Sequence, residues 1–296
     1  MRKVWRAILI IITVLTLLPF GPLLAQADNS RNGKALVLIY HHLAPSRLKI
    51  AYNRIILSPL NFEAQMKYLR NNKYNVISLR EMAESMEKKI PFPPKTVVIT
   101  FDDGYESNYV YAYPVLKKYN IKATINVVVG TIKETNPPFR PDVTSMLTWP
   151  QVQEMQASGL VDFQSHTYNQ HHYALLDGKG ERAGPVLTNQ IFDWSKGRQE
   201  TNAEYKERVY QDLSLAKSVL EEKLGQPIFA LTYPFGSYNS ETQELAEKAG
   251  YKMLVTVKNG HNKPGEQLTD IKRVNVGRGD SFPSLLGKWL GAKKTG

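Results

Sequence analysis

The chain has 296 residues, of which 42% are hydrophobic and 22% are charged, and its formal net charge is +11. This composition is typical of a globular protein and excludes a chain that is disordered throughout. The length accommodates one large domain or two small ones with a sizeable core. The chain has no cysteine, which excludes disulfides and thiolate chemistry.

The N-terminus has the order of a secretory signal peptide. The basic start MRKVWR is followed by the apolar run AILIIITVLTLLPF and by the small-x-small pattern AQA at 25–27. The apolar run contains Pro19 and is shorter than the about 20 residues that a membrane-spanning helix needs. We therefore expect residues 1–27 to be a signal peptide cleaved after Ala27, with an uncleaved anchor as the alternative. Either outcome predicts an exported protein, secreted or bound to the cell surface.

The positive charge bears on the partners of an exported protein. A basic protein outside the cytoplasm associates with anionic cell-wall or membrane surfaces. A basic surface that serves solubility alone is an equal alternative. We expect no nucleic-acid partner, because export argues against it and no Lys/Arg-rich stretch has interleaved aromatic residues. The sequence leaves the oligomeric state open.

A short linker at 28–34 is predicted to precede a single domain at 35–290, with a basic tail at 291–296. Seven short apolar or β-branched runs in this domain are typical of strands buried on both faces of a parallel sheet. The runs are residues 35–41, 96–101, 123–129, 160–166, 229–234, 253–257 and 271–276. Amphipathic segments alternate with them, which predicts a parallel α/β fold. Periodicity alone leaves an open doubly wound sheet and a barrel as alternatives, but the dinucleotide-binding form lacks its G-x-G-x-x-G motif.

Three of the predicted helices have clear local signals. Ser58 is a good N-cap in front of a proline. The sequence SETQ at 240–243 has the pattern of a capping box, and Gly250 is expected to end that helix. A third helix is indicated by an apolar face along residues 205–225.

Unusual polar residues follow four of the predicted strands at the point where each strand ends. The strand ends are YHH at 40–42, FDDG at 101–104, SH at 165–166 and YPFG at 233–236. Ligands bind at the carboxyl ends of the strands in parallel α/β folds. The four strand ends therefore predict one shared site.

Two acids and two histidines in this set suggest a metal site. Asp102 and Asp103 repel each other unless a cation or hydrogen bonds hold them, although Asp-Gly is also a common turn. His166 and His171 can share a ligand only if the chain turns between them, and a structural role is the alternative for each histidine alone. One carboxylate with two imidazoles suits zinc or non-haem iron. A second, unligated carboxylate beside the metal is a general base, which favours hydrolysis.

At these residues the chain resembles the NodB-type polysaccharide deacetylases, carbohydrate esterase family 4, from about Ala35 to Val276. The resemblance is strongest in TVVITFDDGYESNYVYAYPVLKKYNIKATINVVVG at 96–130. Three features are similar to the branch that acts on exported poly-N-acetylglucosamine: the opening LIYHH, the spacing in SHTYNQH, and Tyr233 where the third motif usually has arginine. The resemblance implies an α/β fold, a distorted (β/α)7 barrel in a single domain.

The resemblance also implies the roles of the site residues. Asp102 would be the general base, and Asp103, His166 and His171 would bind a divalent metal. Zinc is the expected metal, with cobalt, nickel or iron as alternatives. His41 would be an active-site histidine that protonates the leaving amine, unless Asp102 returns its proton. The missing third-motif arginine removes a group that orients the base in the family.

Substrate contacts are expected from the third motif and from nearby aromatic residues. The candidates are Tyr40, Tyr168, Tyr233, Pro234, Phe235 and Gly236. The N–H of Phe235 is the expected oxyanion donor, whereas an ordinary core or rim position is the alternative for each tyrosine. His172 is expected to be a neighbour of the metal ligands. His261 lacks the late L-x-x-H pattern in which many family members carry their general acid.

The predicted function is metal-dependent removal of N-acetyl groups from a cell-surface glycan similar to poly-N-acetylglucosamine. Peptidoglycan, chitin oligomers and acetylated xylan are alternative substrates. A catalytically weak glycan-binding envelope protein is a second hypothesis, supported by the missing arginine and late histidine. An iron oxygenase is a third, although we find no cosubstrate site for it. The polar, glycine-rich residues 173–200 form either a substrate-facing loop or a tolerated insertion.

Overall fold

The computed structural model describes residues 33–45, 55–277 and 281–291. The predicted signal peptide, most of the linker and all but the first residue of the predicted basic tail therefore lie outside the described residues. In the part of the chain that is described, no helix is both long enough and apolar enough to cross a membrane.

A parallel sheet forms the centre of the domain. Its strand order is β11–β10–β5–β4–β3–β1–β12, and a short strand β2 pairs with β3 beside this path. The strands are β1 (Ala35–Tyr40), β2 (Asn75–Ile77), β3 (Thr96–Phe101), β4 (Ala123–Val127), β5 (Val161–Ser165), β10 (Ala230–Thr232), β11 (Met253–Val255) and β12 (Val274–Asn275). Each of the seven predicted runs contains one of these strands, and β2 is the strand of this sheet that the sequence analysis missed.

Hydrogen bonds connect the two ends of the strand order. Ile271, which precedes β12, forms a parallel bridge with Val255 of β11. The N–H of Ile271 donates to the carbonyl of Leu254, and its own carbonyl accepts from the N–H of Thr256. The sheet therefore curls round on itself, and the prediction of a single α/β domain with a distorted (β/α)7 barrel is confirmed.

The middle strands are buried on both faces, as their composition predicts. Every residue of β1 and β3 is buried, and these two strands pair in parallel along their full length. Because parallel strands start and stop in register here, Tyr40 and Phe101 reach the same edge of the sheet. The residues that follow them, His41 and Asp102, are thereby placed at one end of the barrel.

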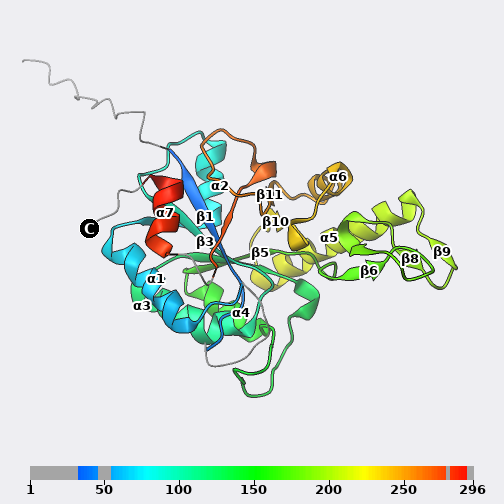
Figure 1. Ribbon diagram of the computed structural model, residues 1–296, viewed down its shortest axis with the longest axis horizontal. Helices are drawn as coiled ribbons and strands as arrows, with labels where there is room; N and C mark the ends of the chain where they lie inside the picture. Colours follow the sequence, from blue (N-terminus) through cyan, green and yellow to red (C-terminus); the bar gives the residue numbers. More distant parts are fainter. Residues whose placement is uncertain (1–32, 46–54, 278–280, 292–296) are drawn as a thin grey trace, which may run out of the picture. The chain divides into compact units, whose positions relative to one another are not determined.

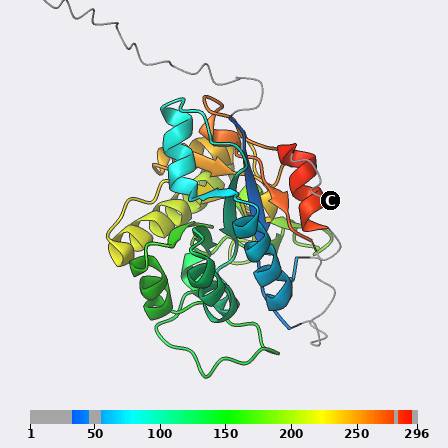
Figure 2. The ribbon, with the colours of Figure 1, turned by 90° about the vertical axis from the view of Figure 1, so that its left-hand side faces the viewer.

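Helices surround this sheet, as Figures 1 and 2 show. They are α1 (Pro59–Asn71), α2 (Leu79–Glu87), α3 (Tyr113–Tyr119), α4 (Trp149–Ala157), α5 (Asn202–Leu224), α6 (Ser240–Lys248) and α7 (Phe282–Leu290). Ser58 caps α1 as predicted, because its hydroxyl accepts from the N–H of Asn61. The predicted apolar face of α5 is buried along the helix.

The predicted capping box of α6 is wrong by one residue. Asn239 is the N-cap, and its Oδ1 accepts from the N–H of Thr242 at 2.8 Å. In return, Oγ1 of Thr242 accepts from the N–H of Asn239 at 2.8 Å. Asparagine is as good an N-cap as serine, so Ser240 becomes the first helical residue. Gly250 follows the helix as predicted, with φ 91°.

Residues 173–200, which we call the arm, form two small antiparallel hairpins. The first pairs β6 (Tyr173–Leu175) with β7 (Ala183–Pro185), and the second pairs β8 (Phe192–Asp193) with β9 (Arg198–Gln199). Figure 1 shows the arm to one side of the barrel, beside the first turns of α5. Arg208 of α5 holds it there, because its guanidinium donates to Glu200 and to two backbone carbonyls of the arm.

Candidate active site and metal centre

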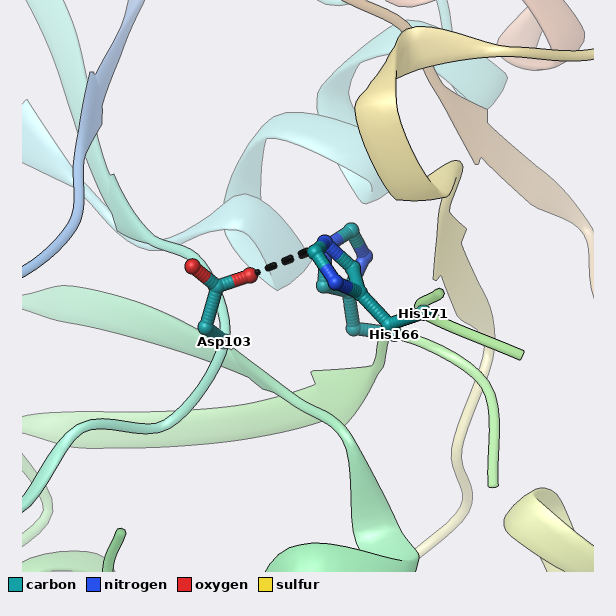
Figure 3. A group of neighbouring side chains, drawn as sticks. All are labelled: Asp103, His166 and His171. Carbon is teal, nitrogen blue, oxygen red and sulfur yellow. Dashed lines mark ion pairs between the residues drawn. The ribbon is translucent and has the colours of Figure 1, made fainter. Parts of the chain in front are cut away.

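Side chains from two of the predicted strand ends come together at the carboxyl end of the barrel. Asp103 follows β3, His166 follows β5, and His171 lies in the loop beyond it. One carboxylate oxygen and one ring nitrogen from each histidine lie within 4.8 Å of one another. Figure 3 shows both imidazoles beside the Asp103 carboxylate. The structure therefore brings together the three residues that the sequence analysis assigned to the metal.

The spacing of these atoms fits a small divalent cation. Oδ1 of Asp103 lies 3.4 Å from Nε2 of His166 and 3.2 Å from Nε2 of His171. Ligand atoms held about 2.1 Å from a tetrahedral metal are about 3.4 Å from each other. Oδ1 of Asp103 is buried without a well-aligned hydrogen bond, so a cation would satisfy an atom that the protein leaves unsatisfied.

The backbone fixes which nitrogen of His166 faces this position. Nδ1 lies 2.7 Å from the carbonyl oxygen of Thr232, an atom that only accepts hydrogen bonds. Nδ1 therefore carries a proton, which leaves Nε2 as the nitrogen available to a metal. Burial lowers the pKa of His166, but the carboxylates of Asp103 and Asp102 outweigh burial, and the pKa is raised. These carboxylates favour positive charge at this position.

The turn between the two histidines is held from two sides. The N–H groups of Tyr168 and Asn169 donate to the carboxylate of Asp212 on α5, at 2.9 and 2.8 Å. The N–H of Gly130, after β4, donates to the carbonyl of Tyr168 at 2.8 Å. Thr167 has φ 76°, so the turn includes a left-handed residue. The chain thus turns between the histidines, as a shared ligand requires.

The turn interpretation of the Asp-Asp-Gly sequence also holds. Asp103 and Gly104 both have positive φ, at 76° and 83°. A Cβ on Gly104 would lie 3.0 Å from Cγ1 of Val127, so the tight turn packs closely on β4. Burial raises the pKa of Asp103, but the surrounding histidines outweigh it, and the pKa is lowered. The turn and the metal-site interpretations therefore describe the same geometry.

Asp102 is buried in a bidentate ion pair with Arg273. Nη1 and Nη2 of Arg273 donate to Oδ1 and Oδ2 of Asp102, each at 2.8 Å, and Asn126 donates to Oδ1 at 2.8 Å. The side chain of Arg273 is fully buried and also donates to the carbonyl of Thr256. Burial would raise the pKa of Asp102, but the guanidinium more than offsets this and holds the pKa well below its ordinary value. Asp102 is therefore a carboxylate of fixed orientation.

Arg273 is one residue of the site that the sequence analysis missed. We expected the base to lack an orienting guanidinium because the third motif has Tyr233; the structure corrects this, since Arg273 provides one from just before β12. A signal was present in the predicted strand IKRVNV, because an arginine in a buried strand needs a carboxylate partner. What the sequence did not show was which carboxylate would meet it.

His41 lies at the end of β1, close enough to interact electrostatically with Asp102, Asp103 and His166. Burial lowers its pKa and outweighs the two carboxylates. Nδ1 of His41 is buried without a hydrogen-bond partner within the described chain. His41 is thus placed beside the proposed base, with a ring nitrogen that the protein leaves free.

Two of the predicted substrate residues, Tyr40 and Tyr233, lie in the core. Tyr40 is 2% exposed and its hydroxyl donates to Gln65, and Tyr233 is 1% exposed and stacks on Tyr238. Both rings belong to the core, which corrects their assignment as walls of a sugar site. Tyr168 is partly buried against the core.

The third motif forms a partly exposed turn beside the proposed metal ligand His171. Pro234–Gly236 form the short helix η4 after β10, in which Phe235 and Gly236 have φ 58° and 67°. A Cβ on Gly236 would lie 2.1 Å from Cγ2 of Val257, so only glycine fits there. Phe235 is 45% exposed, and its ring centroid lies 4.3 Å from that of His171.

Two further histidines lie outside the metal-ligand group. His172 directly follows a proposed ligand but does not belong to that group, in line with its expected place as a neighbour. His261 interacts with surface charges such as Lys34 and Lys263 and not with the site residues.

Comparison with known proteins identifies the family. The family model "Polysaccharide deacetylase" matches residues 89–254, which is more than half of the chain. The chain belongs to the polysaccharide deacetylase family.

Relatives with similar sequences or folds are themselves named as deacetylases. The poly-β-1,6-N-acetyl-D-glucosamine N-deacetylase of Escherichia coli strain K12 is 29% identical over 266 residues, covering 88% of this chain but 39% of that protein. This chain thus spans less than half the length of that relative. The Staphylococcus aureus (strain MRSA252) protein of the same name is 25% identical over 310 residues, with 98% of each chain covered. A solved de-N-acetylase from Aggregatibacter actinomycetemcomitans superposes with a TM-score of 0.75 at 26% identity, covering 86% of this chain and 99% of that one.

Proposed function

We propose that this protein is a metal-dependent N-deacetylase that hydrolyses the N-acetyl groups of a β-1,6-linked N-acetylglucosamine polymer. The observation that carries the proposal is a buried carboxylate, Asp102, oriented by Arg273 directly beside the group of Asp103, His166 and His171. A binding protein would not need a second carboxylate fixed next to a metal-ligand set. The family membership supports the reaction, and the names of the Escherichia coli and Staphylococcus aureus relatives support the polymer.

The residues fit a catalytic divalent cation, which we propose to be zinc. Asp103, His166 and His171 would hold it, and three protein ligands leave further positions open. When bound, the cation supplies Lewis acidity, which polarises the acetyl carbonyl and makes water more acidic. His171 is 25% exposed, so the open side of the ligand group faces the surface.

Asp102 is the proposed general base, and the hydrogen bonds indicate which of its oxygens acts. Oδ1 accepts from both Arg273 and Asn126, whereas Oδ2 accepts from Arg273 alone. A carboxylate oxygen has two acceptor positions, so Oδ2 keeps one free. In the proposed reaction, water attacks the acetyl carbon while its proton passes to Oδ2 of Asp102.

The remaining steps need a hydrogen-bond donor that stabilises the acetyl oxygen and a proton for the leaving amine. The N–H of Phe235, on the exposed turn, would stabilise the negative charge that develops on the acetyl oxygen. The proton that Asp102 takes from water would pass through His41 to the amine nitrogen as the C–N bond breaks, which returns Asp102 to its carboxylate form. The position of His41 beside Asp102 and its unpartnered Nδ1 support this role. The products are acetate and a free glucosamine amine.

The glycan-binding alternative has lost one of its two supports. It rested on a missing orienting arginine and a missing late histidine, and Arg273 now fills the first place. His41 is the proposed proton donor in place of the missing late histidine. We also propose that residues 1–27 direct export of the domain at 35–290 to the cell envelope, which the basic net charge and the N-terminal pattern support.

Acetate release tests the proposed function. The purified protein is treated with a chelator and assayed with β-1,6-linked and β-1,4-linked N-acetylglucosamine oligomers, with and without zinc, cobalt or nickel. We expect release only when metal is restored, and faster release from the β-1,6-linked oligomer. Preference for the β-1,4-linked oligomer would redirect the substrate to chitin or peptidoglycan. No release from either glycan with any of the metals would contradict the proposal.

A further inference from the structure

Two exposed aromatic rings lie in contact beside the metal ligands. The ring centroids of Tyr173 and Phe235 are 4.9 Å apart with an interplanar angle of 63°, and the other neighbour of Phe235 is the imidazole of His171 at 4.3 Å. Tyr173 is 57% exposed and Phe235 is 45% exposed. Large aromatic side chains contribute most when they are covered, so a contiguous exposed pair at a reaction centre indicates a surface that a ligand covers.

Each ring is held by its own backbone. Phe235 has φ 58°, a conformation that is strained for a residue with a side chain and that persists only when its surroundings impose it. The next residue, Gly236, lies too close to Val257 to carry a Cβ, so the turn leaves little space for rearrangement. Tyr173 begins β6, where it pairs with Pro185 of β7. The two rings thus come from separate segments of the chain, the turn at 234–236 and strand β6.

We propose that Tyr173 and Phe235 form a platform for the sugar residue next to the one that is deacetylated, and that Tyr173 thereby makes the enzyme prefer a polymer to a single N-acetylglucosamine. This inference rests on the proposed function. The occupant is the glycan itself, because the platform is continuous with the metal ligand His171. A pyranose ring has a C–H-rich face that packs on an aromatic ring, while its hydroxyls at the rim stay in water.

The arm supplies Tyr173, so the proposal favours the substrate-facing interpretation of residues 173–200 over a tolerated insertion. Tyr173 follows the metal ligand His171 by two residues, so the arm begins at the edge of the site. Leu175, on the same exposed face of β6, is 36% exposed and extends the apolar surface away from the metal ligands. In this interpretation the arm is a substrate-facing element.

The test compares variants of the full chain on a long and a short substrate. For Tyr173→Ala we expect the ratio of kcat/KM for a β-1,6-linked oligomer to that for the monosaccharide to fall by about tenfold, the effect of one lost contact of moderate strength. Tyr173→Phe keeps the ring and should restore the ratio. Trp194→Ala is the matched control, because Trp194 is 64% exposed on the same arm but packs on Phe192 instead of Phe235. Its ratio should equal that of the wild type.

Oligomer binding, measured by calorimetry on the same variants, separates this inference from the proposed function. Weaker binding to Tyr173→Ala than to the wild type, without acetate release from either, would support the platform and overturn the proposed function. Equal ratios and equal affinities for Tyr173→Ala and the wild type would overturn the platform while acetate release stood. An equal loss in Trp194→Ala would also overturn it, since the effect would then belong to the arm as a whole.

Discussion

The guanidinium of Arg273 and the carboxylate of Asp102 meet in the barrel through two N–H···O contacts of 2.8 Å each. The two residues are 171 positions apart in the chain, and Arg273 is fully buried. A buried charge is tolerated when a partner of opposite charge meets it in good geometry. This pair therefore lets a second carboxylate remain ionised directly beside Asp103.

Replacement of Arg273 should impair both catalysis and stability. Arg273→Lys keeps the charge but loses the bidentate geometry, so we expect kcat to fall by about tenfold or more. Arg273→Ala leaves Asp102 buried without its partner and should lower the free energy of unfolding by about 3–5 kcal/mol. Kinetic assays and urea unfolding measure the two effects. Arg80→Ala is a control, because the Arg80–Asp162 pair is partly exposed and should contribute little; a similar loss there would argue against a special role for Arg273.

The same ion pair predicts how stability depends on pH in the metal-free protein. The folded-state pKa of Asp102 is depressed below the unfolded value of about 3.9. Its contribution is therefore fully present above the unfolded pKa and is lost as the pH falls through the folded pKa. Urea unfolding from neutral pH downward should show the difference in stability between the wild type and Asp102→Asn narrowing below about pH 4. A difference that stays constant with pH would contradict the assignment.

Asp212 should affect metal affinity although it lies outside the ligand group. Its carboxylate accepts hydrogen bonds from the N–H groups of Tyr168 and Asn169 and so holds the turn between the proposed ligands His166 and His171. Asp212→Asn replaces one of the two acceptor oxygens with a donor, and we expect the metal to bind about tenfold more weakly. Competition with a metal-sensitive dye measures this. Gln211 is the exposed neighbour of Asp212, and the control variant Gln211→Ala should bind metal as tightly as the wild type. Unchanged metal affinity in Asp212→Asn would show that the turn keeps its conformation without the Asp212 carboxylate.

Gly236→Ala should disturb the turn that carries Phe235. The added methyl group would meet Val257 at 2.1 Å, and the residue has φ 67°. We expect kcat/KM for oligomers to fall as Phe235 moves, with a loss of stability of about 1 kcal/mol or more. Adding Val257→Ala removes the clash but not the unfavourable φ, so activity should return in part. Full activity in Gly236→Ala alone would show that the turn has no part in catalysis.

The barrel strands could be predicted from sequence because both of their faces are buried. A strand such as β3 is a continuous run of apolar and β-branched residues, a pattern typical of strands that are buried on both faces of a sheet. The strands of the arm could not be predicted, because they have two or three residues and are partly exposed. β2 was missed for the same reason, since its three residues are only half-buried.

The grouping of Asp103, His166 and His171 could be predicted because the carboxyl ends of parallel strands meet at one edge. Asp103 and His166 needed no knowledge of register, since each lies within two residues of the end of its strand. Arg273 did need it, because only the position of β12 beside β1 directs that side chain to Asp102. The exposure of Tyr173, and its contact with Phe235, likewise depend on how the arm folds back on the turn.

Acetate release by wild-type protein and by Asp102→Asn, at equal measured metal content, tests the central claim most directly. The account predicts that Asp102→Asn binds metal as the wild type does but releases no acetate from a β-1,6-linked N-acetylglucosamine oligomer, while His166→Ala loses both metal and activity. Wild-type rates in metal-loaded Asp102→Asn would contradict the account, because the carboxylate that Arg273 holds would then not be the base.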